Sequence, residues 1–475
     1  MSSSDLPVSS VSPVSPPLAV PESSPSASAT PPLLRWICTS NPFYVISAAL
    51  FLFGLRVSFG AQASEIDAWA LMGGLAGYTL LLAAAALVLV RFADVWNDVR
   101  TVLLLVVLMF LATSVTFDEL LVLNPQRGRW YFLGGLAFAM ALSEVLLRAI
   151  RLQLPLLFRV PYHLTLALFF LYPLALVPVV RNPHSELLMW GLWGFAPAAG
   201  LIFLTLIPAI RRGRDYLRDN GSPWPWPFYP WSVFVFLALA VCGRAFLLCW
   251  SFHLVPGPND QLIFGLYFLV PFGFALAVVL LELGIVANNR VTRWVALAVP
   301  VLLIVLSGIG HRSDAIYTVF LSHFTEQLGG TPLFVALLAV GGFYLYAWLR
   351  DVPLAPEGLT GVLAALAFVR PDALTLGDLR APLPALLIAA VLLQAWVALW
   401  RDDKWRLAVG ATAAVGWVGT VAWRTYREVR EETAGLDYIL LGLVLLPVAV
   451  LISLVKGGVL SRWVERWTGR TSTTG

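Results

Sequence analysis

Long apolar segments separated by short polar loops constrain this chain more than any other feature of its sequence. They recur from residue 42 to residue 455, and most hold few charges. A helix needs about 20 apolar residues to cross a hydrocarbon core of about 30 Å. Because lipid offers no hydrogen-bond partners, segments that cross it form helices. The sequence therefore predicts an all-α fold, a polytopic transmembrane helix bundle.

We predict about 14 spans, and tryptophans flank many of them, as expected for side chains that prefer the membrane interface. The expected spans are 42–60, 68–90, 101–117, 130–147, 161–180, 185–210, 231–253, 261–287, 294–310, 332–349, 358–369, 382–400, 407–423 and 437–455. The segment 358–369 is short, because a helix of its length reaches only about 18 Å. It either spans with the others or forms a re-entrant element.

Lysine and arginine gather in alternate loops. Counted from a cytoplasmic N-terminus, twenty of the 31 Lys and Arg residues fall on the inner side and nine on the outer side, and two lie within spans. Loops that face the cytoplasm carry such an excess. The pattern predicts that both termini are cytoplasmic and that the protein resides in a membrane, which we expect to be the bacterial inner (cytoplasmic) membrane.

Composition separates the two ends of the chain from the bundle. Residues 1–32 are rich in Ser and Pro and are predicted to form a disordered cytoplasmic tail. Residues 33–457 form the predicted transmembrane domain, and 458–475 a short basic cytoplasmic tail. Charged residues make up 12% of the chain, about half the usual share of about 25%. Little mass remains for a soluble catalytic domain, and the net charge of +4 indicates no nucleic-acid partner.

An arginine lies near the middle of the predicted span 231–253. A charge at that depth is costly unless it is paired or hydrated, so Arg244 is expected to face the bundle interior. Glu144 and Glu282 are intramembrane acids, and depth favours Glu144 as the partner. The pair would act as a substrate counter-ion or gate, or as a structural ion pair.

Two other pairings are predicted from spacing. Arg56 lies near the outer end of its span, where it can reach the interface and meet Asp118 or Glu119. Glu144 and Arg148 are four residues apart on one helix, a favourable local pair that competes with Arg244.

Prolines interrupt several predicted spans. Each one removes a backbone hydrogen bond and frees a carbonyl, which a neighbour or a wet cavity must satisfy in a membrane. The residues are Pro173, Pro178, Pro197, Pro208 and Pro271. Broken helices are typical of transporter binding sites, and simple kinks are the alternative.

Two loops carry candidate sites. An outer-side cluster contains His311, Asp314, His323 and Glu326, whose side chains can act as acids, bases or metal ligands; solvated loop polarity is the alternative. A cytoplasmic loop contains Arg211, Arg212, Arg214, Trp224 and Trp226, which suit anionic lipid headgroups; passive contact with the membrane is the alternative. We predict no catalytic residue, cofactor or metal site, because no recognised motif is present.

Three functions stay open on this evidence. Buried charges and broken helices favour a transport or flippase-like bundle. Short loops favour a non-catalytic scaffold, sensor or complex subunit. The outer cluster favours a membrane-embedded transferase that acts at the outer face. A water-filled cavity at Arg244 would favour transport, whereas a solid core would favour the non-catalytic component.

Overall fold

The computed structural model describes residues 42–59, 65–180, 186–217, 220–224, 226, 228–252, 264–308, 315–328, 330–368, 383–401, 403–432, 445, 446 and 449. Every regular element within these ranges is a helix, which confirms the all-α prediction. Both predicted tails, 1–32 and 458–475, lie outside the described residues, as does most of the predicted span 437–455.

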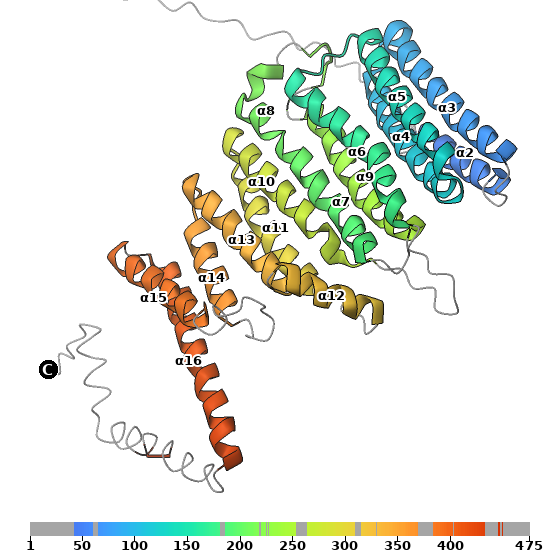
Figure 1. The fold of residues 1–475 in the computed structure, drawn as a ribbon. Helices are drawn as coiled ribbons and strands as arrows, with labels where there is room; N and C mark the ends of the chain where they lie inside the picture. Colours follow the sequence, from blue (N-terminus) through green and yellow to red (C-terminus); the bar gives the residue numbers. More distant parts are fainter. Residues whose placement is uncertain are drawn as a thin grey trace, which may run out of the picture.

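The helices follow one another with short connections (Figure 1). The first half of the chain forms α2 (Phe43–Phe59), α3 (Glu65–Val88), the π-helix η1 (Leu89–Ala93), α4 (Trp96–Leu123), α5 (Pro125–Ala149), α6 (Leu156–Val180), α7 (Glu186–Leu204), α8 (Ile207–Arg211) and the 3-10 helix η2 (Arg214–Leu217). The second half forms α9 (Phe228–Phe252), the 3-10 helix η3 (Leu266–Leu269), α10 (Val270–Val286), α11 (Arg290–Gly308), α12 (Ala315–Leu328), α13 (Pro332–Leu349), α14 (Ala355–Ala367), α15 (Leu383–Arg401) and α16 (Lys404–Glu432).

Within the described residues, nine helices are long and apolar enough to cross a membrane. They are Trp69–Ala93, Trp96–Val122, Pro125–Ala149, Leu156–Pro178, Leu187–Arg211, Phe228–Phe252, Leu266–Val286, Arg290–Ser307 and Pro332–Leu349. The apolar parts of α2, α14 and α15 are shorter, and α16 is not among the nine. The polytopic helical fold is thus supported, while the count of about 14 spans and the orientation of the termini stay predictions.

Two helices organise the packing. α4 contacts α2, α3, α5, α6 and α9, and α10 contacts α7, α8, α11 and α13. Buried residues from α2 to α13 form one apolar core, and residues of α10, α11, α13 and α14 form a second. α10 therefore belongs to both cores and joins the two halves of the bundle. In Figure 1, α12 runs along the lower end and α16 extends away from the other helices.

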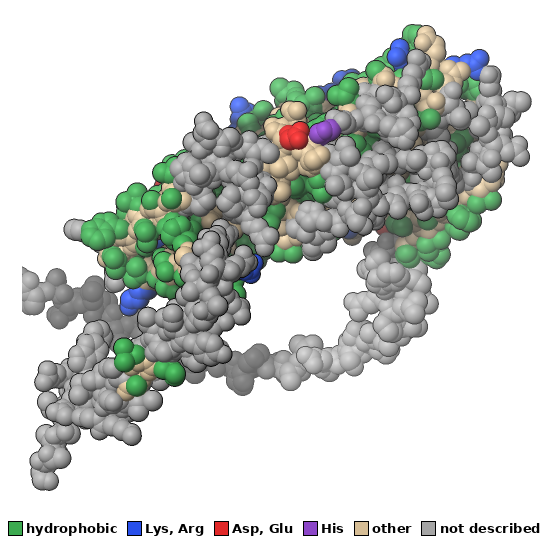
Figure 2. All heavy atoms as spheres, turned by 60° about the horizontal axis from the view of Figure 1, so that its bottom comes forward, with side chains coloured by type: hydrophobic (Ala, Val, Ile, Leu, Met, Phe, Trp, Pro, Cys, Tyr) green, Lys and Arg blue, Asp and Glu red, His purple; other side chains and the backbone are tan. Residues whose placement is uncertain are grey.

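The surface of the described helices is itself apolar. Large side chains such as Leu50, Trp130, Leu201 and Val235 are at least 60% exposed, and hydrophobic side chains cover much of the described face in Figure 2. Soluble proteins rarely expose patches of this extent. A lipid environment accounts for this surface, because it places no cost on apolar exposure.

Most of the basic residues of the described part gather at one end of the bundle, the upper end in Figure 1, which we name the basic end. It comprises Arg91, Arg100, Arg148, Arg151, Arg159, Arg211, Arg212, Arg214, Arg290, Arg293 and Arg350. Contacts tie its connections together: the Arg100 guanidinium lies 4.6 Å from the Phe228 ring centroid, and the Gln153 amide donates to the Asn220 carbonyl at 2.8 Å.

Two of the prolines lie where a helix begins. Pro208 and Pro271 lie in the first turns of α8 and α10, where the missing amide hydrogen would have no intrahelical partner anyway. The predicted spans are interrupted at both positions, because α7 ends at Leu204 before α8 begins, and the 3-10 helix η3 precedes α10. Pro173, Pro178 and Pro197 do lie inside α6 and α7.

Adjacent glycines in α5 test this packing. A Cβ at Gly135 would lie 2.8 Å from ring carbons of Phe117 and Phe170, whereas a Cβ at Gly134 would meet nothing within 4 Å. We expect Gly135→Ala to lower the free energy of unfolding by about 1–3 kcal/mol, because the rings must move. Gly134→Ala should leave it unchanged or raise it slightly. Thermal unfolding of the purified protein in detergent measures both, and equal melting temperatures for the two variants would contradict the packing.

Candidate functional site

The intramembrane charges of the described helices form three networks. Each centres on one acid: Asp118 on α4, Glu144 on α5 and Glu282 on α10. The side chains of Asp118 and Glu282 are fully buried, and that of Glu144 is 21% exposed. Burial of an ionised carboxylate is costly unless cations and hydrogen-bond donors surround it.

Arg244 on α9 pairs with Asp118 on α4, and neither side chain is exposed. The contact is bidentate: Nη1 donates to Oδ2, and Nη2 donates to Oδ1 at 2.8 Å. Such a planar fork gives geometric specificity as well as attraction. The Arg244 Nε is buried without a partner among the described residues.

The same guanidinium reaches backbone carbonyls of two helices. Nη2 lies 3.4 Å from the carbonyl oxygens of Ser114 on α4 and Phe169 on α6. The Phe169 carbonyl would normally accept from the residue four positions later, but that residue is Pro173, which has no amide hydrogen. Arg244 therefore supplies a donor to a carbonyl that Pro173 frees, and it joins α4, α6 and α9.

The predicted pairing of Arg244 with Glu144 is wrong. The predicted span 101–117 ends just before Asp118, but α4 continues to Leu123. Asp118 therefore lies inside the helix. Ser114, Asp118 and Leu121 are all buried, and their spacing of four and three residues places them on one helix face. That spacing was the available signal, and the expected end of the helix concealed it.

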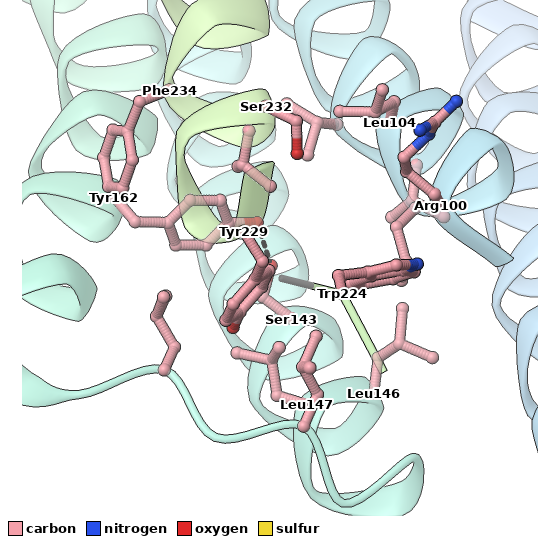
Figure 3. A pocket seen from close by; sticks show the side chains of 16 residues that line it. Arg100, Leu104, Ser143, Leu146, Leu147, Tyr162, Trp224, Tyr229, Ser232 and Phe234 are labelled. Atoms are coloured by element: carbon pink, nitrogen blue, oxygen red, sulfur yellow. Dashed lines mark hydrogen bonds between the residues drawn. The ribbon is translucent and has the colours of Figure 1, made fainter. Parts of the chain in front are cut away.

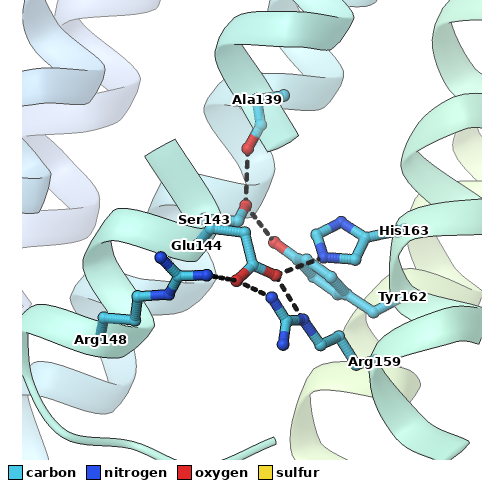
Figure 4. A network of polar contacts seen from close by, with 7 residues as sticks. All are labelled: Ala139, Ser143, Glu144, Arg148, Arg159, Tyr162 and His163. Atoms are coloured by element: carbon cyan, nitrogen blue, oxygen red, sulfur yellow. Dashed lines mark hydrogen bonds and ion pairs between the residues drawn. The ribbon is translucent and has the colours of Figure 1, made fainter. Parts of the chain in front are cut away.

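Glu144 instead belongs to a network near the basic end (Figure 4). The Arg159 guanidinium on α6 binds it through both carboxylate oxygens, and His163 Nε2 lies 2.8 Å from Oε1. Arg148, one turn along α5, is 3.8 Å away, which confirms the predicted local pair. Behind it, the hydroxyls of Ser143 and Tyr162 are 2.8 Å apart.

Glu282 links three helices at the basic end. Arg211, at the end of α8, donates to both of its oxygens at 3.0 and 3.1 Å. Arg350, at the end of α13, contacts it at 3.1 Å, and the Tyr346 hydroxyl donates to Oε1. Arg211, predicted to bind lipid headgroups, is therefore also part of an internal ion-pair network.

The other residues of the predicted headgroup loop differ in their surroundings. Arg212 lies 5.0 Å from the Tyr216 ring centroid, and Arg214 begins η2. Trp224 and Trp226 pack against the first apolar core. Trp224 also borders a cavity between α4, α5, α6 and α9 (Figure 3).

The outer cluster is only partly described. His311 and Asp314 lie outside the described residues. His323 and Glu326 lie on α12 and line a cleft with Trp190 of α7. The described part of the chain contains no group of three or more His, Cys, Asp or Glu residues that could hold a metal ion. Arg56 lies within α2, and its side chain is outside the described ones.

These helices place the chain in the class of multi-span helical membrane proteins, on the basis of their length and apolar composition. No protein-family model, curated protein or solved structure matches the sequence or the fold. The geometry of the chain's own residues therefore carries the functional argument.

A double-mutant cycle tests the central pair. We expect Arg244→Leu to lower the free energy of unfolding by about 3–5 kcal/mol, because it leaves Asp118 buried and uncompensated. Adding Asp118→Asn should recover much of that loss, since no lone buried charge remains.

The matched control is Glu144→Gln, which alters an acid of the same bundle that has its own partners. It should add to the Arg244→Leu defect without rescue. Denaturation in detergent measures the three single variants Arg244→Leu, Asp118→Asn and Glu144→Gln and the two double variants. Rescue by Glu144→Gln together with strict additivity for Asp118→Asn would contradict the observed pairing.

Proposed function

We propose that this chain is a non-catalytic component of a bacterial cytoplasmic membrane, a scaffold or complex subunit with a solid helical core, rather than a transporter. The observation that carries the proposal is the environment of Arg244. Its side chain and that of Asp118 are 0% exposed. Neither residue lines the cavity of Figure 3 or the clefts at His323 and Glu144.

The features that favoured transport have structural roles here. A carrier binds substrate at the midplane between helices that open alternately to the two sides. In this bundle the midplane arginine is held by a carboxylate and by the carbonyl that Pro173 frees. Opening α4 from α9 would separate two buried charges, which is strongly unfavourable.

The transferase alternative has less support. Of the four residues on which it depends, only His323 and Glu326 belong to the described part of the chain. Their cleft adds Gln327 and apolar side chains, and no serine, threonine or cysteine of the described part of the chain lines it. A non-catalytic role agrees better with the site as described.

We further propose that the basic end faces the cytoplasm. Helix ends and connections at this end carry the arginines named above, whereas the start of α5 at the other end carries Arg127 and Arg129. An excess of Lys and Arg marks the cytoplasmic side. The orientation of both termini follows only if the undescribed segments also span as predicted.

Cysteine labelling tests the solid core. In a chain with Cys38, Cys242 and Cys249 replaced by alanine, we expect Ser114→Cys to resist a charged methanethiosulfonate reagent in membranes, because no aqueous route reaches it. The control is Gln153→Cys, an exposed site at the basic end, which should react on permeabilised cells. Rapid labelling at residue 114 would indicate a hydrated path and favour transport.

A second labelling experiment tests orientation. Gln126 and Gln153 are exposed at opposite ends of α5. On intact cells, a membrane-impermeant maleimide should label Gln126→Cys and should label Gln153→Cys only after permeabilisation, because the basic end faces inward. The reverse pattern would show that the basic end faces outward.

A further inference from the structure

A cavity opens between four helices at the basic end. Its walls come from α4, α5, α6 and α9, together with Leu152, Leu154 and Trp224 of the two neighbouring connections (Figure 3). Most of the lining is apolar and aliphatic, including Val106, Leu146 and other Leu and Val side chains. This composition suits a hydrocarbon chain, which gains free energy in proportion to the apolar area removed from water.

Three of the polar side chains that line the cavity have hydrogen-bond partners. The hydroxyls of Ser143 and Tyr162 lie 2.8 Å from each other. The Tyr229 hydroxyl donates to the Gln153 carbonyl at 3.2 Å. These groups hold the walls together.

One edge of the cavity differs. Arg100 and Trp224 lie together on the same side of the cavity in Figure 3. The indole Nε1 of Trp224 is buried and has no partner among the described residues. A buried donor without an acceptor is costly, and Arg100 lines the same edge of the cavity. This edge therefore offers a hydrogen-bond donor and a positive charge to an anion.

More positive charge lies close by. Leu147, Leu152 and Leu154 line both this cavity and a neighbouring cleft that contains Arg148 and Arg159. The two arginines outnumber the single carboxylate of Glu144 in that cleft. Basic pockets between membrane helices on the cytoplasmic side are typical sites for anionic lipid headgroups.

We propose that this cavity binds an anionic phospholipid from the leaflet at the basic end. The phosphate accepts from Trp224 Nε1 and pairs with Arg100, and one acyl chain occupies the apolar space between α4, α5 and α9. The site is independent of the role proposed for the central ion pair, since neither Arg244 nor Asp118 lines it.

Native mass spectrometry of the purified full-length chain tests this site. The protein is released from nanodiscs of phosphatidylcholine that contain phosphatidylglycerol, and bound lipids are counted. We expect phosphatidylglycerol to be retained in preference to phosphatidylcholine. Arg100→Gln should lower its retention about fivefold or more, because a charge-assisted hydrogen bond is lost. Trp224→Phe, which removes the donor and keeps an aromatic ring, should lower it in the same direction.

Two control variants make the same chemical changes outside the cavity. Arg290→Gln removes an exposed charge at the same end, and Trp294→Phe changes an exposed indole of α11 that does not line the cavity. Both should retain phosphatidylglycerol as the unaltered chain does. If Arg100→Gln fails to fold, Trp224→Phe alone decides the result.

Four results would overturn the proposal. One is unchanged retention in Arg100→Gln and Trp224→Phe, and another is equal retention of phosphatidylcholine. The third is displacement of the lipid by millimolar inorganic phosphate, which would mean that the site recognises the free anion and not the lipid. The fourth is a loss of retention that Arg290→Gln reproduces in full, because it would reflect general surface charge.

Discussion

The buried pair of Arg244 and Asp118 is the interaction on which the packing of α4, α6 and α9 depends. It crosses between α4 and α9 and takes in a carbonyl of α6. α4 also contacts α2, α3 and α5, so the pair lies on a helix with many neighbours. A fully buried ion pair adds little net stability compared with well-packed apolar side chains, but breaking it is severe. We infer that its main effect is to specify how the three helices align.

That role follows from the solvent. In lipid, leucine-rich helix faces gain little from association, because the acyl chains around them are equally apolar. Close packing and polar contacts must then determine which helices meet and at what depth. The Glu282 network does this for α8, α10 and α13, since it joins the ends of α8 and α13 to α10. Glu144 does the same for α5 and α6 through Arg159.

The three networks lie in two regions of the protein. Arg244 and Asp118 lie in its interior, whereas Glu144 and Glu282 pair with arginines of the basic end. In the interior, Arg244 and Asp118 neutralise each other and are fully buried. At the basic end, arginines exceed acids, and a cavity opens whose indole N–H has no partner among the described residues. The lipid site proposed at the basic end would suit a protein that organises a membrane assembly, because lipid or partner contacts could change there without disturbing the central ion pair.

The sequence by itself determined the helices, the membrane environment and the burial of Arg244, because these depend on local composition and on segment length. It also identified the local pair of Glu144 and Arg148. Only the tertiary structure decided which carboxylate Arg244 meets, since Asp118 is far away in the chain and lies just beyond the predicted span 101–117, whereas α4 continues to Leu123. It likewise decided that Pro208 and Pro271 begin helices and that Arg159 holds Glu144. Pairing across helices depends on where each helix ends and how it packs, and periodicity within one segment carries no information about either.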